Sequence, residues 1–245
     1  MDSIGKMVEK ALLAGLRYCL CEDAGTNFRC VKVEGTIDSP GPESVFRLRF
    51  GKRSIYLLWR GEQIVLIGAG GPQHMPLIRQ ALEMRGAKLK DITAILLTHA
   101  DVLLNANAAT LRDLSGAKLY IHRLDAPRLA LRFPRSPRHA LRAQMEKRRA
   151  AKLHYAPCPV DFYIGEGDLI DLWYGLTAIS LPGPTPGHCG FYCRHLGLLF
   201  SGALFEERGR WSRFFNLPPF DEEALSESKK KVRSMKLNRT LESVE

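Results

Sequence analysis

The chain of 245 residues lacks any hydrophobic run that approaches the roughly 18 apolar residues of a membrane-spanning helix. Its apolar patch near the N-terminus, Ala11 to Leu16, is closed by Arg17 and is too short for the core of a signal peptide. Internal repeats and low-complexity segments are also missing, and the composition excludes collagen-like, coiled-coil and disordered chains. These absences predict a protein with no membrane span, located in the cytoplasm.

Three nucleotide and hydrolase motifs are absent as well. Neither a Walker loop nor a G-x-S-x-G nucleophile elbow occurs. The segment Gly68-Ala69-Gly70-Gly71 follows an apolar run, but Gln73 stands where the dinucleotide fingerprint requires its last glycine. The sequence therefore argues against a nucleotide-binding loop of either common type.

Acidic residues are fewer than basic ones, 26 against 36, which gives a formal net charge of +10. Such a balance is compatible with nucleic acid, an anionic membrane surface or an anionic ligand, and selects none of them. Six cysteines could form disulfides, but a chain of this length does not need them to fold. Without a secretory signal we expect reduced thiols. The cysteines are Cys19, Cys21, Cys30, Cys158, Cys189 and Cys193.

Hydrophobic periodicity predicts two β-rich halves with helices attached, joined without a linker into one α/β domain of four α/β/β/α layers spanning 1–245. Residues 1–43 are predicted to form an N-terminal extension, with a helix over 1–17. Strands are predicted at Cys30–Ile37, Ser44–Phe50, Ile55–Trp59, Gln63–Ile67, Ile92–Leu97, Lys118–Ile121, Phe162–Ile164, Leu169–Trp173, Thr177–Leu181, Gly190–Arg194 and Leu198–Ser201. Helices are predicted at Met75–Arg85, Leu103–Leu114, most of 123–153 with breaks near Pro134 and Pro137, and Asp221–Met235.

The order of several short motifs narrows the fold further. A strand and glycine-rich loop precede a helix and a buried strand that ends in Thr98-His99-Ala100-Asp101. Much later come Pro182-Gly183-Pro184-Thr185-Pro186-Gly187-His188 and Ser201-Gly202-Ala203. Over about residues 55–235, this order resembles the metallo-β-lactamase superfamily, in particular its glyoxalase II-like hydrolases. The resemblance implies the four-layer sandwich and metal-dependent hydrolysis, in which bound zinc activates a water molecule.

Most positions that hold metal in that family are changed here. His99 matches the first histidine of the family's T-H-x-H-x-D-H loop. The other matched positions carry different residues, four of them apolar: Asp101, Leu103, Leu104, Pro184 and Ala203. The printed chain ends about where the family's C-terminal G-H-G segment would begin, as in a shortened member or a decayed gene. The resemblance thus implies a retained scaffold and a lost metal pair.

A reduced metal site remains an alternative. His99, Asp101 and His188 are the residual candidates for catalysis or for one zinc or iron ion, which needs three or four converging donors. Hydrogen-bonded structure is the competing interpretation of His99, and an N-cap of the next helix that of Asp101. His188, Cys189, Cys193 and His195 also suggest a metal site, but residues four apart on a strand lie about 13 Å apart. Core cysteines are therefore favoured.

The positive charge is local. Residues 121–154 hold ten cationic and two acidic residues, and so carry +8 of the +10. Arginine's planar guanidinium suits phosphate or carboxylate, and the predicted anion-binding residues are Arg135, Arg138, Arg142, Arg148 and Arg149. A solvated helix face explains the pattern equally well.

Three functions follow as hypotheses. The first is a protein that has lost its metal centre and hydrolase activity, needs no cofactor, and acts as a binding or scaffold module through the arginine-rich segment. The second is a residual metal-dependent hydrolase of an ester, thioester, lactone or phosphoester. The third is a nucleic-acid-binding protein. The partner is unknown, with an anionic ligand, nucleic acid or an acidic protein all compatible, and an oligomer is possible.

Overall fold

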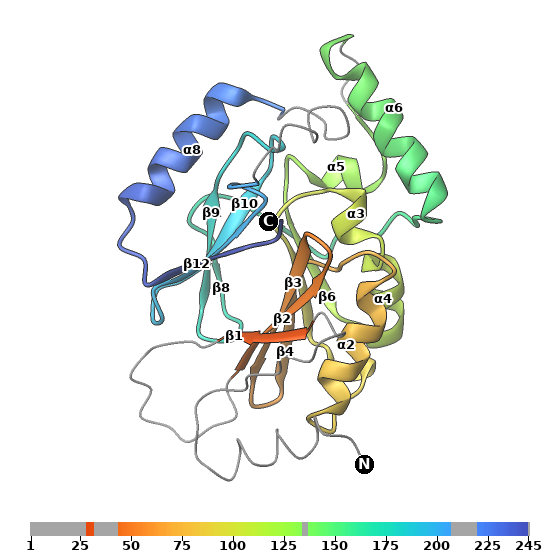
Figure 1. Ribbon diagram of the computed structural model, residues 1–245, viewed down its shortest axis with the longest axis vertical. Helices are drawn as coiled ribbons and strands as arrows, with labels where there is room; N and C mark the ends of the chain where they lie inside the picture. Colours follow the sequence, from red (N-terminus) through yellow and green to blue (C-terminus); the bar gives the residue numbers. More distant parts are fainter. Residues whose placement is uncertain (1–27, 32–43, 134–136, 207–219, 245) are drawn as a thin grey trace.

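The computed structural model describes residues 28–31, 44–133, 137–206 and 220–244, and these residues form two packed β-sheets with helices on both outer faces (Figure 1). The first sheet has seven strands in sequence order: β1 (Phe28–Val31), β2 (Ser44–Phe50), β3 (Arg53–Arg60), β4 (Gln63–Ile67), β5 (Ala94–Leu97), β6 (Lys118–His122) and β7 (Phe162–Ile164). Strands β1 to β4 pair antiparallel, and β4 to β7 pair parallel.

The second sheet has five strands in the order β12-β11-β10-β9-β8. They are β8 (Leu169–Ile170), β9 (Leu176–Ser180), β10 (Cys189–Cys193), β11 (Leu198–Gly202) and β12 (Arg239–Glu242). Its strands pair antiparallel except for β12, which runs parallel to β11 at the edge. The hydroxyl of Tyr56 donates to the carbonyl of Glu242 at 2.6 Å, which ties β12 to the first sheet.

The helices lie outside the sheets. They are α2 (His74–Glu83), the 3-10 turn η1 (Leu89–Asp91), α3 (Val102–Asn105), α4 (Ala108–Ser115), α5 (Ala126–Leu129), α6 (Pro137–Lys152) and α8 (Glu222–Ser234). Helices α2 and α4 cover the seven-stranded sheet, and α8 covers the other sheet on the opposite side of the molecule (Figure 1). Among the described helices, none combines the length and apolar composition needed to cross a bilayer.

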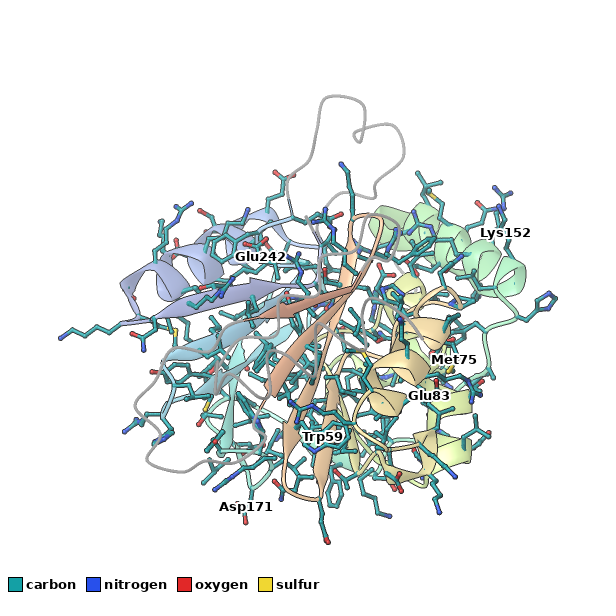
Figure 2. All side chains as sticks on the ribbon, turned by 60° about the horizontal axis from the view of Figure 1, so that its bottom comes forward. Trp59, Met75, Glu83, Lys152, Asp171 and Glu242 are labelled. Atoms are coloured by element: carbon teal, nitrogen blue, oxygen red, sulfur yellow. The ribbon has the colours of Figure 1, made fainter. Side chains whose placement is uncertain are left out.

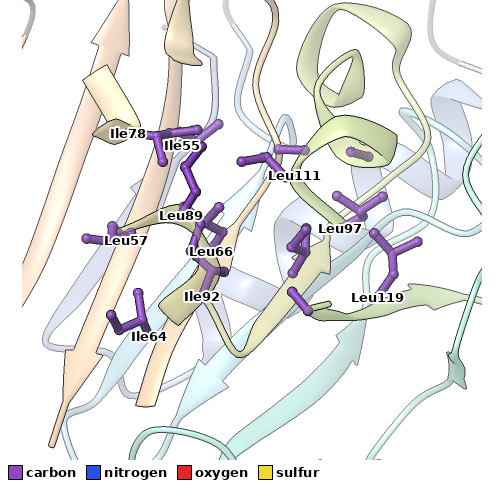
Figure 3. Close-up of a cluster of buried hydrophobic side chains, with 14 of the residues drawn as sticks. Ile55, Leu57, Ile64, Leu66, Ile78, Leu89, Ile92, Leu97, Leu111 and Leu119 are labelled. Carbon is purple, nitrogen blue, oxygen red and sulfur yellow. The ribbon is translucent and has the colours of Figure 1, made fainter. Parts of the chain in front are cut away.

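Three apolar clusters separate these layers. Because successive side chains of a strand point to opposite faces, Leu57 packs in the cluster under the helices while Leu58 packs between the sheets. Figure 3 shows the cluster under the helices, where Leu57, Leu66 and Leu97 meet Ile78 of α2 and Leu111 of α4. A third, smaller cluster lies under α8. The predicted α/β/β/α sandwich is confirmed.

Most strand predictions agree with the structure, and the helix predictions differ where the chain turns. Strands β2 and β4 have the predicted bounds. The helix expected over Leu103–Leu114 is two helices, α3 and α4, because the chain turns between Asn105 and Ala108. The long helical segment after β6 is interrupted in the same way, giving α5 and then α6, which begins at Pro137.

Two elements were not predicted, and two predictions lie outside the described residues. Strand β12 carries a single buried apolar residue, Leu241, so the sequence has no alternating pattern there. The turn η1 has only three residues, which is too short for a periodic pattern. The helix predicted over 1–17 lies outside the described part of the chain, as does the strand predicted beyond Val31.

Candidate functional site

The candidate site lies at the carboxyl ends of the parallel strands β4, β5 and β6. In α/β folds this edge of the sheet is where loops form ligand sites. The loop Thr98–Asp101 follows β5, and the segment His122–Asp125 leads from the end of β6 into α5. A loop of the second sheet, Leu181–His188, reaches the same place, since Cys189 donates its backbone N–H to the carbonyl of Thr98 at 2.8 Å.

Both ring nitrogens of His188 are used in hydrogen bonds within the protein. Nδ1 lies 2.9 Å from the carbonyl oxygen of Leu181, which can only accept, so Nδ1 carries the proton. The backbone N–H of Ala203 donates to Nε2 at 3.1 Å, so Nε2 has no proton. Burial and the charge of His99 lower the pKa of His188 well below its ordinary value. His188 is therefore a neutral imidazole that cross-links two loops.

Two glycines of the recognised motifs are required by this packing. A side chain at Gly202 would place its Cβ 2.6 Å from Nε2 of His188, and the backbone φ of +63° also favours glycine. A Cβ at Gly187 would lie 2.6 Å from the backbone nitrogen of Asp125 and 2.9 Å from Nδ1 of His122. Both glycines thus allow the backbone to approach the buried side chains of the site.

The carboxylate of Asp125 connects three segments of the site. Its oxygens accept from the backbone N–H of Ala100 at 2.7 Å, the hydroxyl of Thr185 at 2.6 Å and the backbone N–H of Gly187 at 2.9 Å. The side chain is fully buried. Asp125 therefore links the loops after β5 and β6 to the proline- and glycine-rich loop of the second sheet. In the sequence its signal is its position shortly after the strand that becomes β6.

His99 lies beside His188, and Asp101 begins the next helix. The two imidazole rings have centroids 5.0 Å apart, and Nδ1 of His99 lies 2.9 Å from the hydroxyl of Thr98. Burial lowers the pKa of His99, against the opposing charges of Asp101 and Asp125. Asp101 accepts from the backbone N–H of Leu103 at 2.7 Å, so it is the N-cap of α3.

The N–H groups of the three glycines in the loop after β4 are occupied by the protein. The N–H groups of Gly68 and Gly70 donate to the carbonyls of Leu96 and Leu104 at 2.8 and 2.6 Å. The N–H of Gly71 donates to Nδ1 of His74 at 3.2 Å. A loop that cradles phosphate offers these groups to the ligand, so this loop has a structural role.

The arginine-rich segment has an inner part that faces the site. Arg128 of α5 is 5% exposed and Glu146 of α6 is 1% exposed. Arg149 contacts Glu146 through an N–O pair at 3.5 Å. Burial, followed by the charge of Asp101, raises the pKa of Glu146 to about 7, although the arginines oppose this. Burial and the like charge of Arg128 lower the pKa of Arg142. These four side chains form what we call the inner cluster: Arg128, Arg142, Glu146 and Arg149.

The outer part of the segment faces away from the sheets. Lys147, Arg148 and Lys152 are exposed on α6, and Figure 2 shows Lys152 at the outer end of this helix. Of the predicted anion-binding residues, Arg142 and Arg149 therefore lie toward the site and Arg148 toward solvent. Arg135 lies outside the described residues, and Arg138 belongs to α6 but its side chain is not described.

Cys189 and Cys193 are buried between the two sheets, and both are free thiols. The ring of His195 instead stacks on Tyr174, with centroids 5.4 Å apart. The structure therefore confirms core cysteines in place of a cysteine–histidine metal site.

A protein-family model described as the metallo-beta-lactamase superfamily matches residues 48–240. The chain belongs to the metallo-beta-lactamase superfamily. Solved metallo-beta-lactamase structures share its fold. The FEZ-1 enzyme of Legionella gormanii is 18% identical with a TM-score of 0.67, over 91% of this chain and 82% of that one. The subclass B3 enzyme BJP-1 of Bradyrhizobium japonicum is 21% identical with a TM-score of 0.61, over 82% and 74%.

A metallo-beta-lactamase family protein of Thermus thermophilus is 16% identical with a TM-score of 0.62, over 89% of this chain and 73% of that chain. At such identities the likeness shows the fold alone. No curated protein sequence matches the chain.

The metal pair of the metallo-beta-lactamase fold does not fit the residues present. Leu103, Leu104, Pro184 and Ala203 have no side-chain donor, and both nitrogens of His188 are engaged. Within the described ranges, no group of three or more histidine, cysteine, aspartate or glutamate side chains could hold a metal ion. A zinc site needs three or four converging donors, and the donor set here is too small.

Proposed function

We propose that this metallo-beta-lactamase-fold chain is a binding module that works without the metal centre and hydrolase chemistry of its family. In this proposal residues 1–245 act as one domain, and the arginine-rich segment 121–154 contacts an anionic ligand. The observation that carries the proposal is the state of His188, whose two nitrogens serve the hydrogen bonds to Leu181 and Ala203. The same imidazole cannot also donate a lone pair to a metal without losing one of these bonds.

The hydrogen bonds of Asp125 are a second observation that supports the proposal. In a metal centre, the ion itself holds together the loops that supply its ligands. Here a buried carboxylate with three hydrogen bonds joins the corresponding loops. The loops of this chain thus have a protein cross-link, and their arrangement needs no ion.

Elemental analysis tests the proposal. The protein is purified without a chelating tag, and zinc and iron are measured in the wild type, in His99→Ala and in the exposed control His154→Ala. We expect far less than one metal ion per chain in all three, and no turnover of ester, thioester, lactone or phosphoester substrates with added zinc. Near-stoichiometric metal that is lost only in His99→Ala would establish the residual hydrolase instead.

A further inference from the structure

Within the described part of the chain, Nε of Arg128 and Oε2 of Glu146 are buried atoms of the inner cluster that have no hydrogen-bond partner. Their residues are 5% and 1% exposed, so solvent replaces little of what is missing. A buried polar atom without a partner costs the free energy of removing it from water, and more so when its group is charged. Such atoms in one cluster indicate that a partner beyond the described residues, such as a bound ligand, completes it.

The guanidinium of Arg128 lies over the ring of Phe133, 5.1 Å from the ring centroid. Among the described residues, Nε of this guanidinium has no hydrogen-bond partner. Arg142 lies in the same region, because the charges of Arg128 and Arg142 both lower the pKa of His99, and the charge of Arg128 lowers the pKa of Arg142. Two guanidinium groups that act on each other in this way favour an anion near both, which each can bind through charge-assisted hydrogen bonds.

We propose that Arg128 and Arg142, together with the carboxyl group of Glu146, bind a small oxyanion, a phosphate or a carboxylate, beside the loop that follows β5. This inference rests on the proposed function, because it assigns a ligand to the site that the lost metal centre leaves. Arg128 donates through Nε, and Glu146 in its protonated form donates from the carboxyl oxygen that has no partner. Because the pKa of Glu146 is raised to about 7, that form is present near neutral pH.

Burial decides between a small ligand and a polymer. The phosphates of nucleic acid are bound by exposed cations along a surface. Arg128 is buried, and the exposed cations Lys147 and Arg148 lie on the other face of α6. The inner cluster therefore suits an ion that enters the site singly.

Calorimetric titration with inorganic phosphate, and separately with a small dicarboxylate, tests the inference at constant ionic strength. Arg142→Gln is compared with Arg148→Gln, which removes the same charge from the exposed face of the same helix. We expect binding by the wild type, binding about tenfold weaker or more in Arg142→Gln, and wild-type affinity in Arg148→Gln. Arg128→Lys keeps the charge but not Nε, and weakens binding in a chain that keeps its fold by circular dichroism.

Three outcomes overturn the inference. They are no binding of either probe at millimolar concentration, equal weakening by Arg142→Gln and Arg148→Gln, and binding of a single-stranded oligonucleotide that Arg148→Gln abolishes and Arg142→Gln does not. The metal analysis is a separate measurement. Stoichiometric metal would overturn the proposed function, whereas failed phosphate binding by a metal-free protein would overturn only the inference about the ligand.

Discussion

Single carboxylates at this site have different roles that depend on their partners. Asp125 receives hydrogen bonds from three donors and is fully buried. Glu146 is also buried, but among the described residues one of its oxygens has no partner and the other meets Arg149 at 3.5 Å. The first therefore acts as a cross-link within the fold, and the second belongs to the cluster for which we propose a ligand.

Replacing Asp125 by alanine removes all three hydrogen bonds and leaves three buried donors. Because hydrogen bonds to a charged group contribute more than neutral ones, we expect the free energy of unfolding to fall by about 3–5 kcal/mol. We expect Asp125→Asn to destabilise the fold as well. Its amide NH2 group would replace an accepting oxygen and face a hydrogen-bond donor. Urea unfolding measures both variants. The control is Asp171→Asn at an exposed position, and an Asp125→Ala protein as stable as this control would contradict the role.

The role of Asp125 has one signal in the sequence, which is its position. It follows the buried strand β6, at the edge where loops of a parallel sheet form sites. The residues that it binds, Ala100, Thr185 and Gly187, are distant in sequence, and no local pattern connects them. The role of Glu146 is equally hard to recognise from the sequence. It is one acidic residue in an arginine-rich helix, and tertiary packing decides which face of that helix points inward.

At the scale of elements, strands were predicted better than the segments that join them. Strands β3 and β5 are buried on both faces, so their apolar runs are continuous and easy to recognise. The division into α3 and α4 has no proline or glycine to signal it, because Asn105 and Asn107 bend the chain through contacts with His99 and Gly71. Those contacts exist only in the folded chain.

Variants of Asp101, at the start of α3, distinguish a helix N-cap from a metal ligand. Asp101→Ala removes the acceptor for the N–H of Leu103, and we expect it to lower the free energy of unfolding by about 1 kcal/mol. Asp101→Asn keeps an acceptor at the cap, and we expect it to stay within a few tenths of a kcal/mol of the wild type. Thermal unfolding compares them. If both variants lose equal stability, and the wild type alone is stabilised by zinc, Asp101 acts as a ligand.

At the scale of the whole molecule, the fold of the family and the chemistry of its site have separate physical origins. The buried residues of the three apolar clusters that hold the described layers together include none of Leu103, Leu104, Pro184 and Ala203. The sandwich can therefore persist while the ligand positions become leucine, proline and alanine. The loops that remain are held by His188, by Asp125 and by the glycines that let the backbone approach them.

The fold also separates the positive charges of the arginine-rich segment into an inward group and an exposed group. The sequence places +8 in residues 121–154, and the structure turns Arg128, Arg142 and Arg149 toward the site and Lys147, Arg148 and Lys152 toward solvent. A helical pattern alone could not show which face was inward, because arginine spacing is the same for a solvated face and for a binding face. Packing of α6 against α3 decides it.

The central claim is that His188 serves the fold and is not available to a metal. Long-range proton–nitrogen NMR of the histidine rings, with His188 assigned by comparison with a His188→Gln protein, tests this most directly. We predict a neutral ring with the proton on Nδ1 and an accepting Nε2, unchanged between about pH 5.5 and pH 8 and unchanged when zinc is added. A zinc-dependent shift of Nε2, or a ring that gains a proton in this pH range, would contradict the account.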